Sequence, residues 1–98
     1  MTVLDDLTRS YRVAFLRYLS RREEAALHSG YELGRSAIAA GVSILELAQV
    51  HHEVLLEALE GAPAEDVTAL ARSASELFLE VVATYDMAQR PFSVVEEG

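Results

Sequence analysis

The sequence predicts an all-α fold, an antiparallel four-helix bundle that forms one domain over residues 1–98. Three observations lead to this prediction. Apolar residues recur every three or four positions in four separate segments, which is the period of amphipathic helices. Short stretches with helix-starting and helix-ending residues separate these segments, and no segment alternates as a β-strand does. Short connections favour antiparallel neighbours, and a chain of 98 residues suits a single core.

The first helix is predicted over 3–19 and the second over 21–40. Apolar residues of the first helix follow alternating spacings of three and four, at Leu4, Leu7, Tyr11, Ala14 and Tyr18. Ser20 and Glu23 then have the spacing of a capping box, in which a hydroxyl and a carboxylate satisfy free backbone N–H groups. This spacing predicts that a new helix begins at Ser20.

Glycines mark two features of the second helix. Gly30 and Gly34 lie on one face, although each costs about 1 kcal/mol relative to alanine inside a helix. We therefore expect another helix to approach this face closely. Gly41 is predicted to end the helix, because glycine readily adopts the left-handed conformation that follows a last turn.

The fourth helix is predicted over 63–90, after a third helix over 44–60. Pro63 suits the first turn of a helix, and two acidic residues follow it where the helix dipole favours negative charge. Pro91 cannot continue a helix, so residues 91–98 are expected to form a tail.

The third helix, opened by the capping-box pair Ser43 and Glu46, is more apolar than one core requires. Its Glu and Gln residues cluster within an arc of about 80° when residues are placed at 100° steps. Such an excess favours a second burying surface, and a homodimer is its commonest source. The alternative is that some of these residues are ordinary exposed apolar side chains. The predicted dimer-interface residues are Val50, Val54, Leu56, Leu79 and Met87.

Composition excludes several function classes. The net charge of −8, with only 8 Lys and Arg, argues against binding to nucleic acid or to anionic membrane surfaces. No apolar run reaches the length of a membrane span, and the acidic start of the chain does not fit a signal peptide. The chain has no cysteine, hence no disulfide or thiolate metal site. We expect a soluble, cytoplasmic protein.

The adjacent pair His51 and His52 raises the question of a metal or catalytic site. Neighbouring residues point about 100° apart on a helix, so the two imidazoles cannot easily share one metal. Glu24 and His28 have a spacing compatible with metal ligation, but they lie on a polar helix face where a solvated charge ladder is expected. Phosphate loops, nucleophile elbows and cysteine nucleophiles are absent from the sequence. We predict no metal, no cofactor and no enzymatic activity, which leaves packing or partner contact for the histidines.

The segment "YELGRSAIAAGVSILELAQVHHEVL", followed later by "ELFLEVVATYDMAQRPF", resembles the N-terminal domain of RsbU-type phosphatases, which regulate stress sigma factors by partner switching. The resemblance extends from about Tyr11 to Phe92. Its most specific parts are 31–35, 51–53, 78–80 and 86–88.

The resemblance implies a helical, homodimeric and non-catalytic domain. It also implies an activating partner, an RsbT-like switch kinase related to the anti-sigma kinases, whose signal is passed to a phosphatase domain. The predicted partner-binding residues are Glu32, Arg35, His51, His52 and Glu53.

Two contexts for this domain stay open. Pro91 interrupts the helix that in the family leads toward the output domain, and the sequence ends at Gly98. The chain is therefore either a regulatory domain excised from a larger protein or a stand-alone protein of the same fold. The alternative function is a stand-alone dimeric bundle that acts as an adaptor or binds a small apolar ligand.

Overall fold

The computed structural model describes residues 2–21 and 24–89. Four α-helices account for most of these residues: α1 (Val3–Arg21), α2 (Glu24–Ala39), α3 (Ile44–Glu60) and α4 (Val67–Gln89). A short 3-10 helix, η1 (Ala64–Asp66), leads directly into α4. There is no strand in the described parts of the chain. The predicted all-α, four-helix fold is therefore confirmed.

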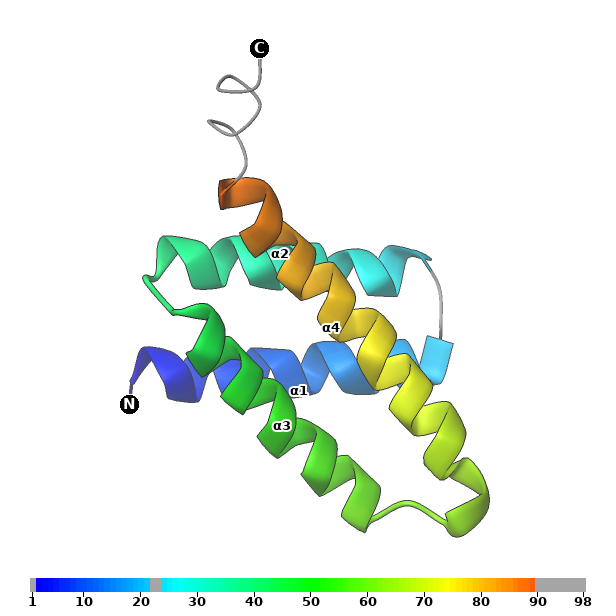
Figure 1. The fold of residues 1–98 in the computed structure, drawn as a ribbon. Helices are drawn as coiled ribbons and strands as arrows, with labels where there is room; N and C mark the ends of the chain where they lie inside the picture. Colours follow the sequence, from blue (N-terminus) through cyan, green and yellow to red (C-terminus); the bar gives the residue numbers. More distant parts are fainter. Residues whose placement is uncertain (1, 22–23, 90–98) are drawn as a thin grey trace.

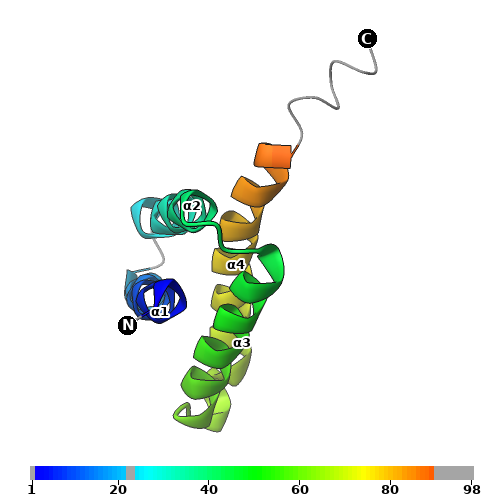
Figure 2. The same ribbon diagram turned by 90° about the vertical axis from the view of Figure 1, so that its left-hand side faces the viewer.

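The helices form two antiparallel hairpins that pack in two layers. α1 and α2 lie side by side, and α3 and α4 form a second pair that crosses them obliquely (Figure 1). The view in Figure 2 looks along α1 and α2 and shows α3 and α4 as a separate layer on one side. No described helix is both long and apolar enough to cross a membrane.

The junction between α1 and α2 differs from the prediction. α1 continues to Arg21, so Ser20 lies within it instead of starting the next helix. The Ser20 hydroxyl donates a hydrogen bond of 3.0 Å to the Leu16 carbonyl oxygen, which is how serine satisfies itself inside a helix. The other half of the predicted capping box, Glu23, lies outside the described residues, as do Arg90 and the predicted tail 91–98.

The connection between α2 and α3 follows the prediction. Gly41 has a φ of +79°, and the N–H groups of Gly41 and Val42 donate to the carbonyl oxygens of Ile38 and Ala37. This pair of bonds is the Schellman arrangement that satisfies the last carbonyls of a helix. Ser43 and Glu46 then form both bonds of the predicted capping box, at 3.1 and 2.9 Å. Local hydrogen bonds thus fix both the end of α2 and the start of α3.

The two layers meet most closely where α2 crosses α4. A Cβ placed on Gly30 would lie 2.9 Å from Leu77 Cδ1, and one on Gly34 would lie 2.8 Å from the Val81 carbonyl oxygen and against Thr84. The close approach predicted from the two glycines is therefore confirmed. Around this contact the core is built from large side chains of α1, α3 and α4, including Tyr11, Phe15, Leu47, Val54, Leu77 and Val81.

Three buried tyrosines of this core form hydrogen bonds through their hydroxyl groups. Tyr18 donates to Glu76 Oε1 at 2.7 Å and Tyr85 donates to the Val42 carbonyl oxygen at 2.9 Å. Tyr11 is hydrogen bonded to His51, as described below. Each ring fills apolar space while its hydroxyl finds a partner on another segment, so the three residues join α1, α3, α4 and the turn after α2.

Candidate interaction surface

The outer face of the α3–α4 layer exposes large apolar side chains. Leu45 is 66% exposed, Leu79 64% and Leu56 45%. Half-buried neighbours extend this surface between the two helices: Leu55, Leu59, Phe78 and Val82. On α3, the exposed positions 45, 52 and 56 and the half-buried position 59 are spaced by seven, four and three residues, which places them in one strip. We call these seven apolar residues, together with His52, the outer α3–α4 face.

Two of the predicted dimer-interface residues do not lie on this face. Val50 is 4% exposed and Val54 2%, and both belong to the core. Because the chain's own helices cover them, their assignment to a dimer interface was wrong for this fold. Leu56 and Leu79 do lie on the outer α3–α4 face. Met87 is exposed, but it comes eight residues after Leu79 and therefore points about 80° away around α4.

His51 points inward from the same helix. Its Nδ1 is hydrogen bonded to the Tyr11 hydroxyl at 2.7 Å, and its ring stacks on Phe78 with centroids 4.1 Å apart. Burial lowers the pKa of His51, and the neighbouring His52 lowers it further. The lowered pKa favours the neutral imidazole, and the contacts of His51 join α3 to α1 and α4. This agrees with the packing interpretation of the sequence.

The remaining predicted partner-binding residues fall on three different surfaces. His52 is exposed on the outer α3–α4 face, whereas Glu53 is exposed 100° further around α3. Glu32 and Arg35 are exposed on α2, in the other layer. The five residues therefore do not form one patch, although four of them are accessible to a partner.

The α2 residues are held by aromatic and ionic neighbours. Glu32 lies 3.5 Å from His28 Nε2, and the His28 ring stacks on Tyr31 with centroids 5.5 Å apart. The Arg35 guanidinium lies 5.9 Å from the centre of the same Tyr31 ring, within the range of a cation–π contact. The half-buried Tyr31 and the exposed His28, Glu32 and Arg35 form a surface cluster, which we call the α2 cluster.

Sequence reasoning did not find the ion pair between α1 and α3. Arg12 Nε lies 2.7 Å from Glu57 Oε1, and a second guanidinium nitrogen lies 3.3 Å from Oε2. The two residues are 45 positions apart, so no local spacing could have indicated the pair. Among the described residues, no three His, Asp or Glu side chains lie close enough together to hold a metal ion.

Comparison with known protein families matches residues 9–88 to the model described as phosphoserine phosphatase RsbU, N-terminal domain. The chain belongs to the RsbU N-terminal domain family. The match covers all of α2 and α3 and most of α1 and α4, so it includes both the outer α3–α4 face and the α2 cluster. No curated protein and no solved structure gives a significant match.

Membership in the RsbU N-terminal domain family confirms the resemblance inferred from the sequence segments. The family model describes the regulatory N-terminal domain of the phosphatase and not its catalytic domain. The two candidate surfaces are consistent with that description. The outer α3–α4 face is apolar and the α2 cluster is ionic and aromatic, and both are suited to contact with another protein.

Proposed function

We propose that this domain is a non-catalytic dimerisation and docking module that receives an activating switch kinase in the cytoplasmic, partner-switching control of a stress sigma factor. The observation that carries the proposal is the outer α3–α4 face. Large apolar side chains exposed on one face of a small domain favour a site of interaction there.

The outer α3–α4 face suits a second copy of the same chain. Under two-fold symmetry the same patch serves both partners, so one set of leucines fills both sides of the interface. Burying a leucine side chain contributes about 1.5–3 kcal/mol, and a stable interface needs about 800 Å² from each partner. Leu45, Leu56 and Leu79 supply the exposed centre, and the half-buried residues around them supply the flanks.

The α2 cluster is proposed as the docking site for the switch kinase. It lies on the other layer, so a kinase bound there leaves the outer α3–α4 face available to the second copy. Glu32 and Arg35 present opposite charges three residues apart, and Tyr31 provides an apolar platform between them. Arg and Tyr are enriched among residues that dominate binding energies at protein interfaces.

The contact between α2 and α4 offers a route for the signal. At Gly30 and Gly34, α2 contributes no side chain to the contact, and at Gly34 its backbone lies directly against Thr84 and the Val81 carbonyl oxygen of α4. A displacement of α2 at Gly34 is therefore transmitted to the α4 backbone. We propose that kinase docking on α2 shifts α4, and that α4 carries this change toward its C-terminal end.

Single-cysteine cross-linking tests the dimer surface, because the chain contains no cysteine of its own. Leu45→Cys, Leu56→Cys and Leu79→Cys are compared with Leu16→Cys, whose parent residue is 52% exposed on α1. Oxidation should link at least one of the first three into disulfide-bonded dimers and leave Leu16→Cys monomeric. Equal linkage of the Leu16→Cys control would contradict the proposed interface.

A pull-down with the purified switch kinase tests the docking site. The wild-type domain is compared with a Glu32→Ala, Arg35→Ala variant and with an Asp6→Ala, Arg9→Ala control, which removes an exposed ion pair from α1. The wild type and the control should retain the kinase, and the α2 variant should lose it. Equal retention by all three would show that the α2 cluster is not the docking site.

A further inference from the structure

A groove of about 680 Å³ lies between α1 and α2. All of its lining residues come from these two helices and the turn that follows α2, so it belongs to the layer opposite the outer α3–α4 face. Along α1 it extends from Val3 to Arg17, which are about 21 Å apart at 1.5 Å per residue. Its volume lies within the range typical of small-molecule sites.

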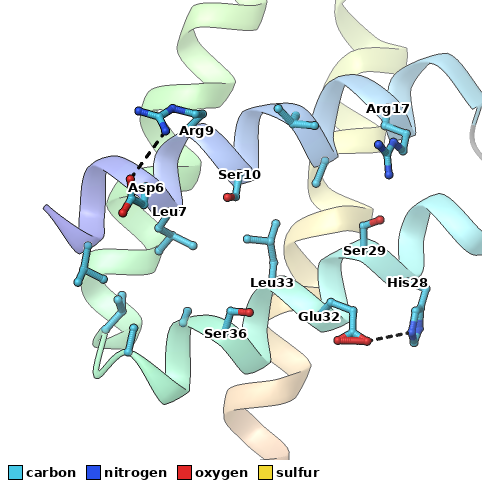
Figure 3. Close-up of a pocket in the computed structure, with 16 residues that line it drawn as sticks. Asp6, Leu7, Arg9, Ser10, Arg17, His28, Ser29, Glu32, Leu33 and Ser36 are labelled. Atoms are coloured by element: carbon cyan, nitrogen blue, oxygen red, sulfur yellow. Dashed lines mark ion pairs between the residues drawn. The ribbon is translucent and has the colours of Figure 1, made fainter. Parts of the chain in front are cut away.

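The floor of the groove is apolar. It is formed by five buried residues that also belong to the core: Leu7, Ala14, Leu33, Ala37 and Val42. Val3 and Val13, 51% and 52% exposed, add apolar surface at its edge. The walls hold small side chains, including Ser10 and Ser36, which leave space along the floor (Figure 3). An elongated aliphatic chain fits such a surface.

The two ends of the groove differ in charge. At one end Arg9 is 3.8 Å from Asp6, so positive and negative charge compensate each other. At the other end the Arg17 side chain points across the groove toward Ser29 (Figure 3). Arg17 forms no ion pair with any of residues 2–21 and 24–89. An uncompensated guanidinium beside a hydroxyl is a suitable receptor for one carboxylate.

We propose that the groove between α1 and α2 binds a free straight-chain fatty acid, with its aliphatic chain on the floor and its carboxylate on Arg17 and Ser29. The apolar length and the single cationic end together select this class. The proposal is separate from dimerisation and kinase docking, because its residues lie on neither proposed interface apart from His28 and Glu32 at the rim.

The charges around the groove favour a monocarboxylate over a more highly charged headgroup. His28, also at this end, is 3.5 Å from Glu32, so its imidazole is already engaged. A phosphate carries up to two negative charges and would meet Glu32 at the rim of a chain whose net charge is −8. One carboxylate balances Arg17 without adding further repulsion.

Titration of the ¹⁵N-labelled domain with dodecanoate, below its micelle concentration and followed by NMR, tests the proposal. Saturable shift changes should concentrate on groove residues such as Ser10, Val13, Ser29 and Ser36. Arg17→Gln should weaken binding about tenfold, because it removes a charge-assisted bond. Arg72→Gln, which changes an exposed arginine of α4 outside the groove, should bind as the wild type does.

Two further arms keep the test decisive. Dodecan-1-ol, which has the same chain without the charge, should bind at least tenfold more weakly than dodecanoate. Ser36→Trp should block binding by filling the groove while circular dichroism shows an intact helical fold. Equal binding of the alcohol would overturn the role of Arg17. Shift changes on the outer α3–α4 face instead, or no saturation at all, would overturn the site and leave the groove as a surface for a partner helix.

Discussion

The two layers of this domain present opposite kinds of outer surface. The outer α3–α4 face carries leucines that are up to 66% exposed, and His52 is its main polar interruption. The outer side of α1 and α2 also exposes single apolar residues such as Val13 and Leu16, but it carries ions and small polar residues around a groove whose floor is already buried. Both layers share one core, so the difference does not arise from folding of the single chain. The apolar α3–α4 layer therefore suits the proposed contact with a second copy of the chain, and the more polar α1–α2 layer suits the proposed kinase and small-molecule contacts.

The largest effect is expected where the two layers meet. Gly34→Ala gains about 1 kcal/mol of helix propensity. Its new methyl group, however, lies 2.8 Å from a backbone carbonyl oxygen and against Thr84, and neither can move without separating α2 from α4. We expect a net loss of about 3 kcal/mol in the free energy of unfolding, measured by urea denaturation. Gly61→Ala, where a methyl group would meet open space, is the control and should change stability by less than about 1 kcal/mol. A Gly34→Ala domain as stable as the wild type would contradict the close packing.

The next effect should separate the two outer faces. Leu45→Glu with Leu79→Glu places two carboxylates in the proposed dimer interface, where each must lose its hydration. We expect the dimer dissociation constant to rise at least about a hundredfold, measured by sedimentation equilibrium. Val13→Glu with Leu16→Glu, at two α1 positions that are each 52% exposed, is the matched control. If the two double variants weaken the dimer equally, the dimer interface does not lie specifically on the outer α3–α4 face.

A smaller loss should follow from cutting a bond that joins the layers inside the core. Tyr11→Phe removes the hydroxyl that is 2.7 Å from His51 Nδ1 and keeps the ring that fills the core. Loss of one such bond costs about 1 kcal/mol, and the half-buried imidazole is left without this partner. Thermal unfolding of the variant beside Tyr31→Phe, whose ring lies on the surface of α2, measures the difference. Equal melting temperatures would mean that the bond contributes nothing.

The same residue pair predicts a pH dependence. The pKa of His51 is lowered in the folded chain, so between that pKa and about 6.5 the unfolded chain binds more protons than the folded one. Stability should therefore be fully present above pH 6.5, fall as the pH drops below it, and level off below the folded pKa. In urea denaturation as a function of pH, His51→Gln should flatten this region of the profile and His52→Gln should largely retain it. An unchanged profile for His51→Gln would assign the dependence to other groups.

The smallest effect is expected for the ion pair that joins the layers at the surface. Arg12 and Glu57 keep 41% and 58% of their side-chain surface exposed, so water and salt screen their attraction. Glu57→Gln should lower the free energy of unfolding by at most about 1 kcal/mol, and less at high salt. A loss that exceeds that of Tyr11→Phe would show that this pair, and not the buried bond, holds α1 to α3.

Local signals in the sequence predicted much of the fold. Ser43 with Glu46, Gly41, and the pair Gly30 and Gly34 each specify a backbone arrangement through their own chemistry, and the structure contains all three. Ser20 was misassigned because its spacing to Glu23 resembles a capping box, whereas its hydroxyl bonds backward within α1. A serine supports both arrangements, so the spacing alone could not decide between them.

The interface residues were less predictable than the helices. Helical periodicity tells which residues share a face, but not which neighbouring helix covers that face. Val50 and Val54 were therefore assigned to a dimer, whereas the packing against the rest of the chain buries both. Leu56 and Leu79 stayed exposed because they lie on the side of each helix away from the core. The groove between α1 and α2 depends on how far apart two helices lie, which no single-helix pattern contains.

The mass of the wild-type domain in solution tests the central claim most directly. One chain has a mass of 10.8 kDa. Light scattering at tens of micromolar should give twice that value, because the outer α3–α4 face is then covered by a second copy. A mass of 10.8 kDa under the same conditions would contradict the proposed dimer and leave this face without its partner.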